Sequence, residues 1–260
     1  MQKFLNINPE KTSQKIINFL KKEFSERQKR TAILAISGGI DSAVCAFLCA
    51  KAKLNLYLVN LPYGGQSVKD GMSVAKELKL SEKQTLTINI GRVVDEQIKE
   101  IEKSVKLDQV DKGNIMARQR MIVQYALAKK LNGLVVGTEN LSEYYLAYFT
   151  LYGDQACDIR PIASLLKTQV YQLGKYLGVP EKITKKAPSA ELWKEQTDEK
   201  ELGFSYEEAD PIIYLYKVKN LNKEKILKKY PFNNSLINKV IERIDSTEYK
   251  RENPPKCIFC

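Results

Sequence analysis

The segment TAILAISGGIDS, residues 31–42, constrains the fold of this chain more than any other stretch. Apolar and small residues lead into Ser37-Gly38-Gly39, and the run that starts at Ala43 has the composition of a helix. We therefore predict a buried strand, a glycine turn and a helix start. Two adjacent glycines can adopt backbone angles closed to other residues, and they let a ligand come close to the main chain.

This glycine turn has the features of an anion-binding site. Free backbone amides and the positive end of the following helix attract phosphate groups. Ser37 and Ser42 add hydroxyl groups, and Asp41 suits a position beside phosphates if Mg²⁺ bridges the two. The alternative interpretation is a plain turn in which Asp41 is an ordinary helix N-cap. Neither GxxxxGK[ST] nor GxGxxG occurs near the turn, so those two nucleotide motifs do not apply.

The rest of the chain alternates between apolar strand patterns and helical patterns. We expect further strands at 54–61, 85–90 and 134–138, and helices from Pro9 and at 68–80, 93–104, 115–131 and 167–177. Short helices at 206–219, 223–229 and 234–245 would form a C-terminal helical segment. This order predicts an α/β fold, a doubly wound, Rossmann-like parallel sheet with helices on both faces. Ligands bind such sheets at the carboxyl ends of the strands, where 37–42, 61–67, 138–143 and 152–160 are expected.

The composition narrows the possible chemistry. The chain has no histidine, which excludes imidazole acid–base catalysis and His metal sites. Its net charge of +11 suits either nucleic acid or anionic small substrates, and the scattered lysines favour the second. Cys45 and Cys49 are expected to be buried, and the pair Cys257 and Cys260 makes a poor zinc site. Without a signal peptide or a long apolar run, we expect a cytoplasmic protein with no membrane partner.

The polar segment 185–203 separates the predicted sheet from the C-terminal helices. It contains the only tryptophan, Trp193, among charged residues. One interpretation is a surface loop with one exposed aromatic ring, and the other is a mobile lid that orders over a bound nucleotide. The composition alone leaves both open.

Six ordered motifs resemble those of the NAD synthetases, and the glycine turn resembles the pyrophosphatase loop of the wider ATP pyrophosphatase superfamily, whose fold is called adenine nucleotide alpha hydrolase-like. The resemblance runs from about residue 10 to residue 252. The motifs are KGNIMARQRM (112–121), VGTENLSE (136–143), YGD with Asp158, Pro161 and LLKT (152–168), PSAEL (188–192), TDEKELG (197–203) and TEYKR (247–251).

The resemblance implies the ammonia-dependent form of the family, a single domain over residues 1–260 with a C-terminal tail at 248–260. Longer members carry a glutaminase domain, for which 260 residues leave no room. The implied reaction is a ligation: deamido-NAD attacks the α-phosphate of ATP, and ammonia then displaces AMP to give NAD. Phosphoryl transfer of this kind depends on positioning and charge neutralisation, so it needs no histidine. The family acts as a homodimer whose dinucleotide site is shared between subunits.

The resemblance also assigns roles to individual residues. The implied ATP-binding residues are Ala35, Ile36, Ser37, Gly38, Gly39, Ile40, Asp41, Ser42, Thr138, Lys167 and Ser189. The implied Mg²⁺ ligands are Asp41 and Glu143, and the implied deamido-NAD residues are Arg118, Asp158, Tyr249 and Lys250. Lys167 would reach the phosphates and Asp154 would orient ammonia or take its proton. Two of these residues have plainer alternatives, since Glu143 could be a first-turn helix acid and Lys167 a solvated lysine.

Two positions depart from the family pattern, and both lie on the dinucleotide side. Leu151 replaces a lysine that often precedes Tyr-Gly-Asp, and Tyr249 replaces a histidine. For Arg120 we prefer a structural ion pair. Two other functions stay open: a tRNA-modifying ATP pyrophosphatase, which the basic charge would suit, and a nucleotide-binding sensor without catalysis. The chain has no concentrated basic arm that would support the tRNA-modifying function. It keeps Asp41 and Lys167, whose loss would favour a sensor without catalysis.

Overall fold

The computed structural model describes residues 3–193 and 195–258. Its centre is a parallel sheet of four strands in the order β3-β2-β1-β4. The strands are β1 (Thr31–Ala35), β2 (Asn55–Asn60), β3 (Thr85–Thr87) and β4 (Gly133–Val135). The predicted parallel α/β sheet is therefore confirmed.

Strand β1 lies in the middle of this sheet. It pairs with β2 on one side, Thr31 opposite Asn55, and with β4 on the other, Thr31 opposite Gly133. The chain runs from β1 to β2 and β3 on one side of β1 and then crosses to β4 on the other side, and ligands bind at such a switch point. The glycine turn follows β1 directly, so the register places it where the crevice of an open α/β sheet opens.

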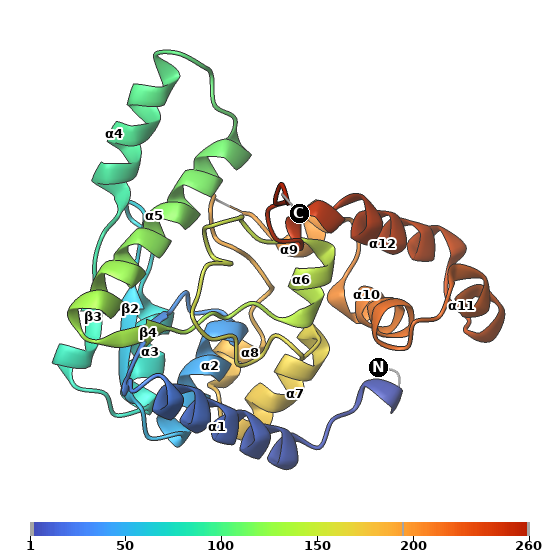
Figure 1. Ribbon diagram of the computed structural model, residues 1–260, viewed down its shortest axis with the longest axis horizontal. Helices are drawn as coiled ribbons and strands as arrows, with labels where there is room; N and C mark the ends of the chain where they lie inside the picture. The colour runs from blue at the N-terminus through green and yellow to red at the C-terminus, as the bar shows by residue number, and fades with distance from the viewer. Residues whose placement is uncertain (1–2, 194, 259–260) are drawn as a thin grey trace.

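Helices cover both faces of the sheet (Figure 1). On one face Ala32, Leu34 and Leu56 pack against α1 (Pro9–Glu26), α2 (Ile40–Lys51), α3 (Lys69–Glu77), α7 (Lys167–Leu177) and α8 (Glu181–Thr184). On the other face Ile33 and Val59 pack against α4 (Gly91–Glu102) and α5 (Gln109–Lys130). Residues that alternate along β1 therefore enter two separate apolar clusters, as the pleat of a strand requires. The predicted double winding is confirmed.

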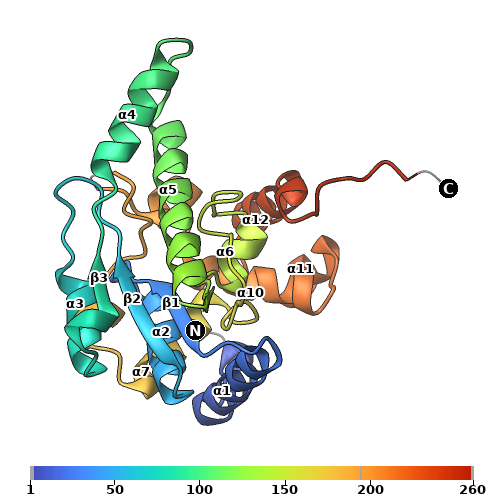
Figure 2. The ribbon, with the colours of Figure 1, turned by 60° about the vertical axis from the view of Figure 1, so that its left-hand side comes forward.

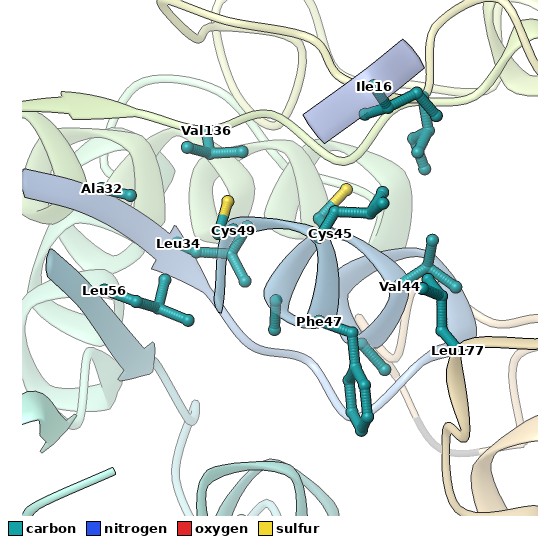
Figure 3. Packing of buried hydrophobic residues seen from close by; sticks show 14 of the residues in the cluster. Ile16, Ala32, Leu34, Val44, Cys45, Phe47, Cys49, Leu56, Val136 and Leu177 are labelled. Atoms are coloured by element: carbon teal, nitrogen blue, oxygen red, sulfur yellow. The ribbon is translucent and has the colours of Figure 1, made fainter. Parts of the chain in front are cut away.

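Helix α2 is apolar over most of its surface because it lies between the sheet and α7. Figure 3 shows Cys45 and Cys49 on this helix, beside Leu34 of β1 and Val136. Both thiols are buried, as predicted, and burial raises the pKa of Cys49 to about 12. These two cysteines are packing residues.

The C-terminal helices form a third apolar cluster beside the sheet (Figure 1). The elements are α10 (Tyr206–Ile213), the π-helix η3 (Tyr214–Val218), α11 (Lys223–Lys229), α12 (Asn234–Ser246) and the 3₁₀-helix η4 (Glu248–Lys250). They pack on α6 (Leu141–Leu146), and Leu5 of the 3₁₀-helix η1 (Lys3–Leu5) joins the same cluster. The predicted C-terminal helical segment is confirmed, and it lies against the element that follows β4.

Several element boundaries differ from the predicted ones. Helix α5 begins at Gln109 instead of 115 because Asp108 accepts a hydrogen bond from the amide of Asp111 at 2.8 Å, an N-cap six residues earlier. Strand β3 ends at Thr87, and beyond β4 only Val136 continues, as an isolated bridge to Ile159. The segment 185–203 is partly helical, since Thr197 caps α9 (Asp198–Leu202).

The end of the chain leaves the body of the protein. Figure 2 shows the segment after η4 extending away from the helices, and Cys257 in it is exposed and free. Its predicted partner in the CxxC pair, Cys260, lies outside the described residues. Among the described helices, none combines the length and apolar character needed to cross a membrane.

Candidate active site

The glycine turn between β1 and α2 is shaped by close contacts. Gly38 has a φ of +81°, and a Cβ atom added there would lie 2.5 Å from the Cβ atom of Asp70. Glycine is therefore required both for its conformation and for space. The Ser37 Oγ atom accepts a hydrogen bond from the amide of Gly39 at 3.2 Å and lies 3.1 Å from the Ser42 Oγ atom.

Asp41 lies in the first turn of α2, where Gly39 is the N-cap. The alternative interpretation of Asp41 as an N-cap is therefore wrong. Its carboxylate instead points to two residues from other elements: it accepts a hydrogen bond from Asn140 Nδ2 at 2.9 Å and forms an ion pair with Lys167 Nζ at 2.5 Å. The carboxylate is thus held at the carboxyl edge of the sheet.

Glu143 reaches the same point from α6. Asn140 caps this helix, and the amides of Asn140 and Glu143 each donate to the other's side chain, at 3.2 Å and 3.0 Å. The second carboxylate oxygen of Glu143 lies 2.9 Å from Lys167 Nζ. The side chain is therefore both the first-turn acid of the plainer interpretation and a member of the central cluster.

Lys167 is the first residue of α7 and is only 2% exposed, so the alternative interpretation of a solvated lysine is wrong. Its ammonium group lies between Asp41 and Glu143 and 5.2 Å from the centre of the Tyr206 ring. Burial would lower the pKa of this ammonium, but the two carboxylates raise it well above its usual value, so it stays charged. Burial raises the pKa of Glu143, and the ammonium opposes that rise.

These side chains open onto a cleft of about 400 Å³ between the sheet edge and the segment 186–201. That volume is in the range of small-molecule sites. Twelve of the predicted functional residues line it: Ala35, Ser37, Gly39, Ile40, Asp41, Ser42, Thr138, Glu143, Asp154, Lys167, Ser189 and Lys250. The fold therefore brings most of the predicted ATP-binding residues together.

Five predicted residues lie outside the cleft wall. Ile36 is buried in the apolar core, and Gly38 faces Asp70. Arg118 is exposed, with its Nε atom donating to the carbonyl of Leu151 at 3.2 Å. The carboxylate of Asp158 accepts from the amide of Val135 at 2.7 Å. The fifth, the Tyr249 side chain, is 68% exposed.

Three predicted residues of the cleft wall are already engaged within the chain. Asp154 accepts a hydrogen bond from the amide of Thr150 at 2.8 Å, and burial raises the pKa of its carboxyl group. Lys250 Nζ donates to the carbonyl groups of Ala147 and Phe149 at 2.7 Å and 2.6 Å. Ser189 Oγ donates to the carbonyl of Gln196 at 2.7 Å.

Some residues of the cleft were not predicted to be there. Arg120 lines it, and our prediction of an ion pair is wrong, because the guanidinium group bonds to uncharged acceptors among the described residues. The guanidinium donates to the carbonyl of Leu61 and to Gln66, both at 3.1 Å, and burial lowers its pKa. Asn140 does not line the cleft but donates to Asp41, and its place between Thr138 and Glu143 in one motif could have indicated it.

Asp41 and Glu143 supply only some of the ligands that a divalent cation needs. Among the described residues, no group of three or more Asp, Glu, Cys or His side chains converges to hold a metal. Asp41 and Glu143 do direct oxygen atoms at one point, where the Lys167 ammonium now acts as a positive charge between them. Two carboxylate oxygens completed by water and phosphate oxygens are a ligand set typical of Mg²⁺.

The sheet, the glycine turn at its switch point and the charged cleft define a class of nucleotide-binding α/β proteins. Comparison with known families makes the assignment specific, since a model of the NAD synthase family matches residues 12–254. The chain therefore belongs to the NAD synthase family.

Individual relatives agree with this assignment. The chain is 37% identical to an NH₃-dependent NAD⁺ synthetase of Fusobacterium nucleatum, with 96% of each chain covered. It is 40% identical to one of Pyrococcus horikoshii, covering 94% of this chain and 93% of the relative. Among solved structures, an NMN synthetase from Francisella tularensis has a TM-score of 0.83 and 34% identity, covering 98% and 100% of the two chains. An NH₃-dependent NAD synthetase from Campylobacter jejuni has a TM-score of 0.81 and 30% identity, covering 97% and 100%.

Proposed function

We propose that this chain amidates deamido-NAD with ammonia to give NAD, using ATP and releasing AMP and pyrophosphate. The observation that carries the proposal is the convergence of Asp41, Glu143 and Lys167 beside the glycine turn, in a chain whose relatives are NH₃-dependent NAD⁺ synthetases. The carboxylate of the substrate would attack the α-phosphate of ATP to form an adenylated dinucleotide, and ammonia would then displace AMP. A cytoplasmic location remains part of this proposal.

The turn residues would hold the phosphates of ATP. Backbone amides at the start of α2 and the hydroxyl groups of Ser37 and Ser42 are donors at the positive end of a helix. Thr138 and Ser189 line the same cleft and would contact the nucleotide. Mg²⁺, bound by Asp41 and Glu143, would supply charge neutralisation of the phosphates.

Lys167 would change partners when ATP binds. In the structure its ammonium already neutralises both carboxylates that would hold the metal. Phosphate oxygens offer the ammonium a new anionic partner, and its release would free carboxylate oxygen atoms for the metal. Lys167 would then stabilise the negative charge on the pyrophosphate leaving group, which is the main demand of phosphoryl transfer.

The dinucleotide would bind at the other end of the cleft. Lys250 and Asp154 line the cleft, and Arg118 and Asp158 are exposed residues outside its wall. Asp154 would orient ammonia or accept its proton, a role that fits a carboxylate whose pKa is raised by burial. Arg118 would pair with the anionic groups of the dinucleotide.

We further propose that the enzyme is a homodimer. Figure 2 shows α4 and α5 projecting together beyond the sheet. Large apolar side chains on and beside these helices are about half exposed, namely Val93, Val105, Val110 and Ile122. Contact with a second copy would bury these side chains and would also cover Arg118 on α5. The second copy would thereby complete a dinucleotide site that one chain leaves open.

A second candidate substrate is nicotinate mononucleotide, whose amidation would give NMN. The likeness to the Francisella tularensis NMN synthetase favours it, with a TM-score of 0.83. Leu151 and Tyr249 also replace polar groups on the dinucleotide side of the family pattern. The chemistry at the ATP side would be unchanged, because only the group beyond the substrate's own phosphate differs.

Product analysis tests these proposals together. The protein is incubated with ATP and Mg²⁺, with deamido-NAD or nicotinate mononucleotide as acceptor, and with ammonium or glutamine as nitrogen donor. We expect NAD, AMP and pyrophosphate to form only when deamido-NAD is the acceptor and ammonium is the nitrogen donor. Higher kcat/KM for the mononucleotide would favour the second candidate. No amide product with either acceptor would contradict both, and salt-sensitive tRNA binding would then favour the tRNA-modifying alternative.

A further inference from the structure

The N-cap residue of α7 offers no side-chain acceptor to the first amides of that helix. This N-cap residue is Leu166, whose apolar side chain accepts no hydrogen bond, and Lys167 is the first residue of the helix. The first amides of a helix find no acceptor within the helix and need one from elsewhere. Here the amide of Lys167 donates to Ser142 Oγ at 2.9 Å, and the amide of Thr168 donates to an oxygen of Asp210 at 2.8 Å.

Asp210 therefore caps a helix to which it does not belong. It lies in α10, more than 40 residues after Lys167 in the chain, and it is fully buried. Its other carboxylate oxygen accepts a hydrogen bond from Ser142 Oγ at 2.5 Å. Ser142 is fully buried as well, so both bonds are shielded from water. One carboxylate thus joins the start of α6 to the start of α7.

These two helix starts carry the central side chains of the cleft. Glu143 follows Ser142 directly, and Lys167 precedes Thr168. A shift of either helix start would move a carboxylate or an ammonium relative to Asp41. The ion pairs at 2.5 Å and 2.9 Å therefore depend on a distance that Asp210 fixes from behind.

Packing of α10 alone does not account for a charged residue at this position. The neighbours Ala209, Ile212 and Ile213 are fully buried apolar residues. Burial of a carboxylate is costly unless hydrogen bonds and opposite charge compensate it, and burial raises the pKa of Asp210 to about 6. An apolar residue would avoid that cost but would leave the amide of Thr168 without an acceptor.

We infer that Asp210 is a positioning residue for the reaction, acting through Ser142 and Thr168 to set Glu143 and Lys167 against Asp41. The inference deepens the proposed function and rests on it for the roles of those three side chains. Residues that support metal ligands from behind in this way typically change metal affinity or activity by about 10- to 100-fold when they are replaced.

The substitution Asp210→Asn tests the inference with little change of volume. An asparagine has one oxygen and one NH₂ group, so its oxygen can accept from the Thr168 amide or from the Ser142 hydroxyl, but not from both. The negative charge is lost, and an NH₂ group that faces Ser142 can only donate, which reverses the direction of that bond. Ser142→Ala is the second variant, because it breaks the link to α6 and leaves the bond between Asp210 and Thr168 in place.

The control is Ile237→Ala, a fully buried residue of α12 in the same apolar cluster as α10. It should lower the thermal unfolding temperature without removing a hydrogen bond at the start of α6 or α7. The first readout is the dissociation constant of Mn²⁺, measured by electron paramagnetic resonance with a non-hydrolysable ATP analogue bound. The second is kcat for amide formation, alongside the KM for deamido-NAD.

We expect Asp210→Asn to weaken Mn²⁺ binding by about 10- to 100-fold, with a similar fall in kcat and little change in the KM for deamido-NAD. Ser142→Ala should weaken Mn²⁺ binding in the same direction, and it decides the matter if Asp210→Asn does not fold. Ile237→Ala should bind Mn²⁺ as the wild type does. Equal Mn²⁺ affinity in the folded Asp210 or Ser142 variants and in the control overturns the inference. Mn²⁺ affinity requires no turnover, so a wild type that forms no NAD would contradict the proposed function and leave this comparison decisive.

Discussion

The proposed ATP side of the site and the proposed dinucleotide side differ in how their side chains are held. At the proposed ATP side, Asp41 and Glu143 each pair with the buried Lys167, and both carboxylates are largely covered. At the proposed dinucleotide side, Arg118 and Tyr249 are exposed, and each belongs to a different element. The first arrangement is pre-organised within one chain, whereas the second gains its full set of contacts only with a ligand or a second copy. Substitutions at the ATP side should therefore lower kcat, and those at the dinucleotide side should raise the KM for that substrate.

The largest effect is expected for Asp41→Asn. The change removes a negative charge from the pair that would hold Mg²⁺ and also unbalances Lys167. Loss of several kcal/mol of charge stabilisation should lower kcat on the order of 10³-fold. Steady-state kinetics in saturating Mg²⁺ would measure it, and near-normal turnover would remove Asp41 from the metal site.

Lys167→Met should come next, with kcat lowered roughly 10²- to 10³-fold because no ammonium remains for the pyrophosphate. The same variant sharpens the comparison in a second way. Since Lys167 competes with the metal for both carboxylates, free Mn²⁺ should bind more tightly to the variant than to the wild type in the absence of nucleotide. Weaker binding without nucleotide would contradict the proposed change of partners.

Gly38→Ala should disturb the ATP side through the backbone. A Cβ atom at a φ of +81° and 2.5 Å from Asp70 would force the turn to move. We expect a loss of about 1–3 kcal/mol in the free energy of unfolding, measured by denaturant titration, and a higher KM for ATP. Gly178→Ala is a useful control because its φ is +82° with no atom near its Cβ position, so it carries the strain without the clash.

Glu139→Gln tests the boundary between the two sides. Glu139 follows Thr138, is 6% exposed and pairs with Arg160 at 3.2 Å, while burial raises its pKa from 4.5 to about 7. Because the folded state binds this proton more tightly than the unfolded state, its contribution to stability is present at low pH and is lost as the pH rises from about 4.5 to 7. The wild type should therefore lose up to about 3 kcal/mol relative to the Gln variant over that range. We would measure the free energy of unfolding of both proteins between pH 4 and pH 8. Parallel pH profiles, in which the two values stay within about 1 kcal/mol of each other at every pH, would contradict the prediction.

The smallest effect is expected for Arg118→Ala. An exposed arginine that gains one charged partner on binding should change the KM for deamido-NAD by about 10-fold. The kcat value and the KM for ATP should stay near those of the wild type. A fall in kcat with unchanged KM would mean that Arg118 acts on the reacting atoms, and the contrast between the two sides would fail.

The ATP side could be predicted from sequence because its chemistry is concentrated in short motifs. The glycine turn gives the strand end, the helix start and Asp41 within twelve residues, and one further motif supplies both Thr138 and Glu143. The parallel sheet then follows from alternating strands and helices, whose carboxyl ends must meet at one edge. The start of α5 was missed because the capping residue Asp108 lies in a polar stretch without apolar periodicity.

Contacts between distant elements could not be predicted in this way. Nothing near Asp210 in the sequence indicates that its carboxylate accepts from the amide of Thr168, since that pairing depends on how α10 packs on α7. The environment of Arg120 was mispredicted for a related reason, because its acceptors, Leu61 and Gln66, belong to the loop after β2. Spacing within a motif reveals neighbours in the chain, whereas these bonds depend on tertiary packing.

The bonds made by η4 have a consequence for the order in which the protein becomes complete during its synthesis. The four strands are all present once residue 135 has been made. Lys250, however, donates to the carbonyl groups of Ala147 and Phe149, and Arg251 donates to that of Tyr145, more than 100 residues earlier. The carbonyl groups of Tyr145, Ala147 and Phe149 therefore lack these partners until residues 250 and 251 have left the ribosome. A nascent chain can form the sheet early, but one wall of its cleft is held in place only after Lys250 and Arg251 have been made.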